Sequence, residues 1–130
     1  MTRGYRILIV DDDADYVAAV GAYLEANGFT VVTAANGQEG LRMAARHRPA
    51  LIIMDVMMGD RTEGLFAVNE LRRLPGLERT PIIVASALYT TEPEFTVPPE
   101  AEWLAGATFL GKPVDLSVLL ERINTLLDMG

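Results

Sequence analysis

The sequence predicts a doubly wound α/β fold, in which helices cover both faces of a five-stranded parallel sheet. Short runs of apolar, β-branched residues alternate along the chain with amphipathic segments of helical periodicity. The runs are nearly continuous rather than alternating, which is typical of strands buried on both faces. Strands that are separated by helices pair in parallel through right-handed crossovers, so these observations together favour a covered parallel sheet.

The first half of the chain contains three expected strands and two expected helices. The strands are expected at 6–10, 29–34 and 50–54, and the helices at 14–27 and 38–47. Asp13 is a suitable N-cap for the first helix, and Gly28 is a suitable stop. In the second helix we expect Leu41, Ala44 and Ala45 to face inward.

The second half of the chain continues the alternation, with one irregular segment. A helix is expected at 64–74, strands at 81–85 and 107–110, and a last amphipathic helix at 115–128. The segment 88–100, between the fourth and fifth strands, contains Pro93, Pro98 and Pro99. Because proline interrupts helices, we expect the fourth helix to be short or irregular, covering at most 99–105.

Composition limits the classes of protein to which the chain can belong. A length of 130 residues suits one domain, 1–130, with a single core. A net charge of −7 argues against nucleic-acid binding, and the absence of cysteine excludes disulfides and thiolate metal sites. The sequence has neither a long apolar run nor a signal segment, so we expect no membrane association and a cytoplasmic location.

Polar residues follow four of the five expected strands. They are Asp11 and Asp12 after the first strand, Asp55 after the third, Ser86 after the fourth and Lys112 after the fifth. Parallel strands end at one edge of a sheet, where ligands of such folds bind. The second strand is followed by no comparable group, which suggests that it lies at the margin. These ends fit the strand order 2-1-3-4-5 of flavodoxin-like folds.

The carboxylates at this edge point to a hard divalent cation. Several neighbouring carboxylates repel one another, and a bound cation removes that repulsion. Oxygen ligands without histidine or cysteine favour Mg²⁺. A carboxylate, a hydroxyl and the only lysine of the chain around Mg²⁺ suit phosphoryl transfer, with aspartate as the nucleophile.

With these residues at the strand ends, the sequence resembles a known family, the receiver domains of response regulators, and within it the single-domain chemotaxis type. The resemblance extends over the whole chain. It is carried by Val10-Asp11-Asp12, Met54-Asp55-Val56-Met57-Met58, Val84-Ala85-Ser86-Ala87 and Phe109-Leu110-Gly111-Lys112-Pro113, in family order.

The resemblance implies a phosphoacceptor and a metal site. Asp55 would accept the phosphoryl group. Mg²⁺ would be held by Asp12, Asp55 and the main-chain carbonyl of Met57, and Asp11 would help through a water molecule.

It also implies a switch. Lys112 would pair with the phosphoryl group, Ser86 would supply the hydroxyl that moves toward it, and Phe109 would take the aromatic switch position. The donor would be a histidine kinase or a phosphotransfer protein, and output would pass to a protein partner through strand five and the last helix. The resemblance suits a monomer or a weak dimer.

Three alternatives remain open from the sequence. The chain could be a receiver from a larger regulator or hybrid kinase. An Asp-nucleophile phosphatase would need a second aspartate two residues after Asp55, where Met57 stands. A flavodoxin-like binding module would need a phosphate-binding loop, and no glycine-rich motif follows the first strand. We therefore expect a switch rather than a classical enzyme.

Overall fold

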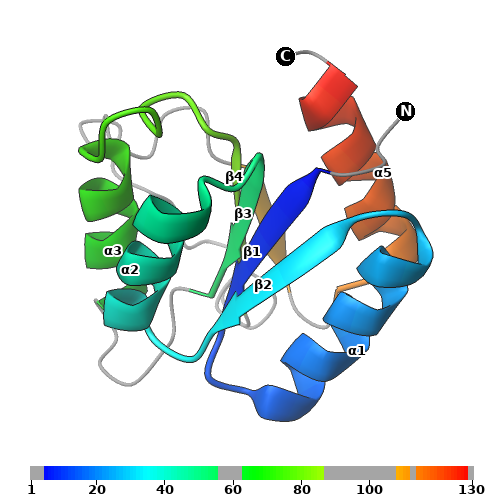
Figure 1. Cartoon of the computed structure of the whole chain (residues 1–130). Helices are drawn as coiled ribbons and strands as arrows, with labels where there is room; N and C mark the ends of the chain where they lie inside the picture. Colours follow the sequence, from blue (N-terminus) through cyan, green and yellow to red (C-terminus); the bar gives the residue numbers. More distant parts are fainter. Residues whose placement is uncertain (1–4, 56–62, 87–107, 112–113, 129–130) are drawn as a thin grey trace.

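The fold is a five-stranded parallel sheet between two layers of helices (Figure 1). The computed structural model describes residues 5–55, 63–86, 108–111 and 114–128. The strand order is β2-β1-β3-β4-β5, and every neighbouring pair is parallel. The predicted fold class and strand order are thus confirmed. The short helix expected at 99–105 lies outside the described residues.

Each predicted strand and each predicted helix of the described ranges is present, with ends that shift by at most two residues. The elements are β1 (Arg6–Val10), α1 (Ala14–Ala26), β2 (Thr30–Ala34), α2 (Gly37–His47), β3 (Leu51–Met54), α3 (Glu63–Arg72), β4 (Ile82–Ser86), β5 (Thr108–Gly111) and α5 (Leu116–Asp128).

The sheet separates two apolar cores. Helices α2 and α3 cover one face, and α1 and α5 cover the other (Figure 1). In β1, Leu8 and Val10 pack toward the first core, while Ile7 and Ile9 pack toward the second. Successive strand residues point to opposite faces, so both faces need apolar side chains. This requirement explains the continuous apolar runs of the sequence.

The ends of α1 follow the predicted capping chemistry. A carboxylate oxygen of Asp13 accepts a hydrogen bond from the amide of Tyr16 at 3.1 Å. Beyond the helix, Gly28 has a φ of 96°, a conformation that glycine adopts without a Cβ clash. The amide of Phe29 then donates to the carbonyl of Leu24 at 3.2 Å, which closes the last turn.

The inward face of α2 differs from the prediction at one position. Gly37, Gly40 and Ala44 are buried, whereas Ala45 is exposed. At about 100° per residue, Ala45 lies roughly a quarter turn from the centre of the buried stripe, so it misses the core. The expected burial of Ala45 was therefore wrong, and that of Ala44 is confirmed.

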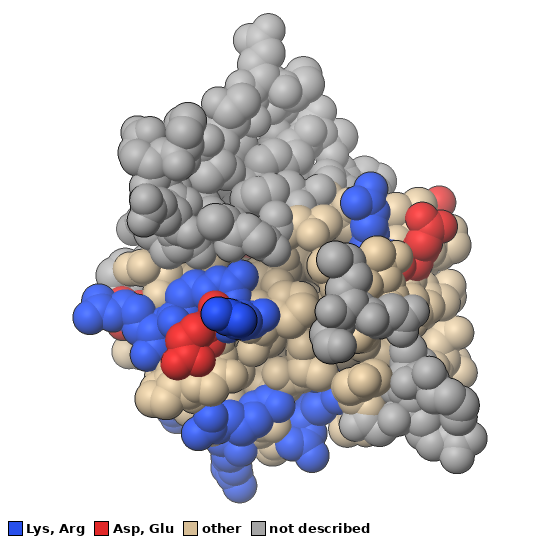
Figure 2. Space-filling model, turned by 90° about the horizontal axis from the view of Figure 1, so that it is seen from above, with Lys and Arg blue, Asp and Glu red and all other residues tan. Residues whose placement is uncertain are grey.

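Three arginines donate hydrogen bonds to loop carbonyls at the edge of the sheet where the strands begin. The guanidinium groups of Arg6, Arg48 and Arg72 donate to the carbonyl oxygens of His47, Pro75 and Thr80, at 2.7, 2.6 and 2.5 Å. Figure 2, which views the molecule from this side, shows a group of basic side chains there. Among the helices that the structure describes, none is long and apolar enough to cross a membrane.

Candidate functional site

Three carboxylates meet where β1 and β3 end. One oxygen from each of Asp11, Asp12 and Asp55 lies within 4.8 Å of the others. The two strands are neighbours in the sheet, and Val10 pairs with Met54 in register. The residues that follow these two positions therefore emerge side by side at the same edge.

Backbone hydrogen bonds fix the positions from which these side chains project. The amide of Asp55 donates to the carbonyl of Val10 at 3.0 Å, and the amide of Asp11 donates to the carbonyl of Ala34 at 3.0 Å. A carboxylate oxygen of Asp11 accepts the amide of Asp13 at 2.9 Å. Asp11 and Asp55 thus extend the sheet hydrogen bonding of β1 and β3 into the site.

The three carboxylates differ in their access to solvent. Asp11 is 3% exposed and Asp55 is 7% exposed, whereas Asp12 lies at the surface. Placing three negative groups this close, two of them buried, raises the energy of their fully ionised state. A cation offsets that repulsion. Oxygen donors alone favour a hard ion, so these residues fit Mg²⁺ better than zinc or copper.

The remaining predicted site residues can be placed only by their backbone or not at all. Ser86 ends β4 and pairs with Gly111, the last residue of β5, so both strand ends lie at the same edge as Asp55. Phe109 lies within β5, opposite Val84. Lys112 directly follows β5, but Lys112 and Met57 lie outside the described residues.

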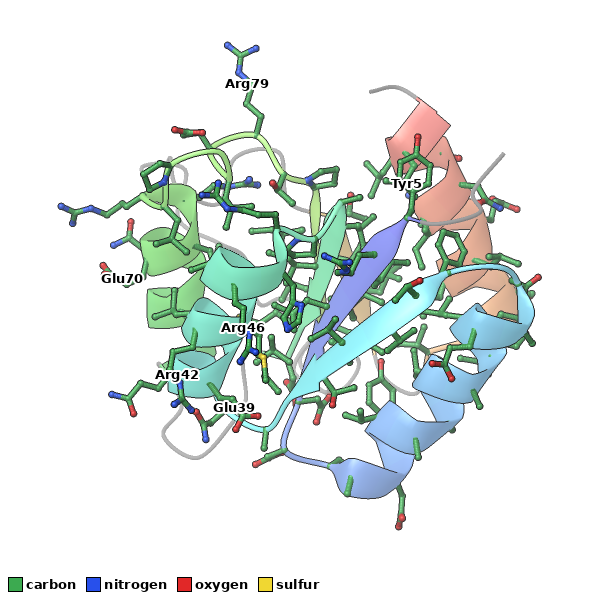
Figure 3. The ribbon with its side chains drawn as sticks, in the orientation of Figure 1. Tyr5, Glu39, Arg42, Arg46, Glu70 and Arg79 are labelled. Carbon is green, nitrogen blue, oxygen red and sulfur yellow. The ribbon has the colours of Figure 1, made fainter. Side chains whose placement is uncertain are left out.

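One acidic residue beside the cluster was not predicted from the sequence. Figure 3 shows Glu39 at the start of α2. Together with Asp11 and Asp12 it lines a groove of about 470 Å³. Its carboxylate accepts the amide of Ala35 at 3.0 Å, and its own amide donates to Asn36 at 2.8 Å. This arrangement resembles a capping box, except that the glutamate accepts the amide of Ala35, the residue before the N-cap Asn36. The pattern Asn36-x-x-Glu39 was therefore a usable signal for its position.

Comparison with known proteins gives a consistent result. The family model described as "Response regulator receiver domain" matches residues 7–124. Protein PilH of Pseudomonas aeruginosa is 32% identical over 122 residues, which cover 94% of this chain and 97% of PilH.

A longer relative and a solved structure extend this comparison. The transcriptional regulatory protein PrrA of Mycobacterium tuberculosis is 36% identical over 123 residues, and this chain spans about half of its length (49%). The crystal structure of a CheY-like receiver domain protein from Methanospirillum hungatei matches with a TM-score of 0.80 at 28% identity. That match covers 97% of this chain and 95% of the solved one.

Proposed function

Because this chain belongs to the response regulator receiver domain family, we propose that it is a phosphoacceptor switch and that Asp55 carries the phosphoryl group. The donor in this proposal is a histidine kinase or a phosphotransfer protein, which presents a phosphohistidine. Such a switch would act in the cytoplasm, where its donor displays that group.

The observation that carries the proposal is the meeting of Asp11, Asp12 and Asp55 within 4.8 Å at the strand ends. A phosphoacceptor needs an ionised carboxylate at a fixed position, close to groups that can hold a cation. The amide of Asp55 donates to the carbonyl of Val10, and Asp55 directly follows a fully buried strand, so its backbone has little freedom.

The chemistry assigns a different task to each residue. An oxygen of Asp55 attacks the phosphorus, the P–N bond to the histidine breaks, and the imidazole keeps the electron pair and takes a proton. Asp11 and Asp12, with Asp55 and the carbonyl of Met57, would hold Mg²⁺. When bound, this ion supplies positive charge for the phosphoryl oxygens. Lys112 would supply the second positive charge.

The signal to a downstream protein would start from residues at the same edge of the sheet. In the proposal, Ser86 moves toward the phosphorylated Asp55, and Phe109 responds within β5, where its backbone lies two residues before Gly111. The new charge would bias a two-state surface formed by β5 and α5, to which a downstream protein binds. The chain would therefore signal by changing shape rather than by turning over a substrate.

This domain could act alone or as one part of a longer protein. PilH, which this chain matches over nearly its full length, suggests a domain that acts alone. PrrA, of which this chain spans 49%, suggests a receiver joined to a further domain. Both forms use the same phosphoacceptor.

The proposal is tested by mass spectrometry of the intact protein after incubation with acetyl phosphate. We expect one added phosphoryl group in the presence of Mg²⁺ and none when EDTA is present. The matched variants are Asp55→Asn, which should gain no mass, and Asp15→Asn, an exposed aspartate of α1 outside the cluster, which should react like the wild type. A phosphoryl group that persists in Asp55→Asn would overturn the proposal.

A further inference from the structure

The sheet has an open edge at β2. Figure 1 shows β2 at the margin of the sheet, and its one partner among the described strands is β1. The amide of Thr30 donates to Tyr5, and the carbonyl of Ala34 accepts from Asp11. Because hydrogen bonds of a strand alternate between its two sides, the amides and carbonyls of Val31 and Thr33 point away from β1. Two donors and two acceptors thus face outward.

Within the part of the chain that the structure describes, this edge lacks the usual protection against added strands. Edge strands are commonly blunted by lysine, proline, a bulge or an inward charge. The strand β2 has the sequence Thr-Val-Val-Thr-Ala, without charge, proline or glycine, and it pairs with β1 in unbroken register. Its two valines are only half-buried. The strand is therefore well suited to accept another extended chain.

A groove lies beside the same edge and gives an added strand room for its side chains. It has a volume of about 470 Å³ and runs between α1 and β2. It is lined by the short side chains of Ala18 and Ala22 from α1. From β2 it is lined by Val31 and Thr33, the two residues whose backbone groups face away from β1. A segment paired with Val31 and Thr33 would place alternate side chains in this groove.

The charges around the groove identify the chemistry of its occupant. Among the described residues that line it, every charged one is acidic: Glu25 near the start of β2, and Asp11, Asp12 and Glu39 near its end. Helix α1 contains no basic residue. An extended segment with lysine or arginine at both ends complements this arrangement, because each end meets a carboxylate.

The same charges disfavour a second copy of this chain as the occupant. If two copies paired antiparallel through β2, Glu25 of one copy would approach Asp12 and Glu39 of the other. Like charges that face each other in this way oppose association.

We propose that the open edge of β2 and the adjoining acidic groove bind an extended, basic segment of a partner protein by strand addition. This surface goes beyond the phosphoacceptor role, and its test needs no phosphorylation. Affinity would come from backbone hydrogen bonds to Val31 and Thr33, and selectivity from the carboxylates at both ends of the groove.

The test uses the peptide Lys-Thr-Val-Thr-Val-Thr-Lys and its counterpart with glutamate at both ends. Titration calorimetry should give a dissociation constant of about 10 µM to 1 mM for the lysine peptide, weakened by salt, and no binding of the glutamate peptide. Hydrogen exchange should show that the amides of Val31 and Thr33 become protected. Equal binding of both peptides, binding without this protection, or no binding at millimolar peptide would overturn the proposal.

Two neighbouring alanines provide matched variants. Ala18 and Ala19 are both exposed on α1, but only Ala18 lines the groove. Ala18→Lys should weaken binding of the lysine peptide by about tenfold or more, whereas Ala19→Lys adds the same charge and should change it by less than about threefold. Thr33→Pro, which removes an outward amide, should also weaken binding. Equal effects of Ala18→Lys and Ala19→Lys would contradict the assigned surface.

Discussion

The amide of Asp55 donates to the carbonyl oxygen of Val10 at 3.0 Å, which joins the end of β3 to the residue just before Asp11. This hydrogen bond continues the pairing of β1 and β3 to the two strand ends that the carboxylates follow. The spacing of Asp11 and Asp55 is thus set by the packed sheet rather than by a surface loop. Precise positioning of this kind is what a cation site requires.

Replacement of Asp12 tests the proposed metal site. Asp12 is exposed, and its carboxylate lies within 4.8 Å of two others. Asp12→Asn should weaken Mg²⁺ binding by about tenfold or more, because it removes a charged ligand. Without divalent ions its free energy of unfolding should not fall, because like-charge repulsion is relieved. Titration calorimetry and urea unfolding measure the two effects, and unchanged Mg²⁺ affinity would refute the assignment.

Replacement of the adjacent Asp13 should have the opposite effects, lowering the free energy of unfolding but leaving the Mg²⁺ affinity unchanged. Its carboxylate accepts the amide of Tyr16 and caps α1, and it lies outside the three-carboxylate cluster. Asp13→Ala should lower the free energy of unfolding by about 1 kcal/mol. Its Mg²⁺ affinity should stay close to that of the wild type, because the amide that Asp13 donates to Asp11 is retained. A large loss of Mg²⁺ affinity would mean that Asp13 belongs to the cation site.

Replacement of two adjacent arginines tests whether side-chain hydrogen bonds stabilise the loops at the edge of the sheet where the strands begin. The Arg72 guanidinium donates to the carbonyls of Thr80 and Glu78 at 2.5 and 3.4 Å, and partial burial lowers its pKa. Arg72→Ala should cost about 2 kcal/mol of stability, the range for hydrogen bonds made by charged groups. Arg73, whose side chain is 75% exposed and 4.0 Å from Glu70, should cost less than about 0.5 kcal/mol when replaced by alanine. Equal losses in urea unfolding would contradict this account.

The start of α5 should respond to acid. The Asp115 carboxylate accepts the hydroxyl and amide of Ser117 and the amide of Val118, and these hydrogen bonds lower its pKa below the ordinary value of an aspartate. A carboxylate whose pKa is lower in the folded state stabilises that state at pH values above its unfolded-state pKa. This stabilisation is lost as the pH falls through the folded-state pKa. NMR titration should show the lowered pKa in the wild type. In Ser117→Ala the pKa should rise, because the hydroxyl donor is absent, and an unchanged pKa would exclude that cause.

The sequence was sufficient to predict the fold and the placement of the described carboxylates. Asp11 and Asp55 follow continuous apolar runs, and such runs identify buried parallel strands whose ends share an edge. Ala45 was assigned to the wrong face, because periodicity marks the direction of the buried stripe but not its width. On α2 the stripe is narrow, and residues as small as Gly40 fill it.

Features that depend on two distant elements could not be predicted in the same way. The groove between α1 and β2 depends on how closely the helix packs on the strand, which no local pattern specifies. Glu39 was overlooked because the second helix was expected to begin at residue 38, whereas Asn36 caps α2 and the helix begins at Gly37. Its role at the groove emerges only when the start of α2 is placed next to the end of β1.

The most direct measurement of the central claim locates the phosphoryl group itself. The protein is phosphorylated with acetyl phosphate and Mg²⁺, reduced with borohydride, which converts an aspartyl phosphate to homoserine, and digested for tandem mass spectrometry. We predict homoserine at position 55 alone, with none in a sample prepared without Mg²⁺. Conversion at Asp11 or Asp12 with residue 55 unchanged, or no conversion in a protein that binds Mg²⁺, would contradict the assignment of Asp55 as the phosphoacceptor.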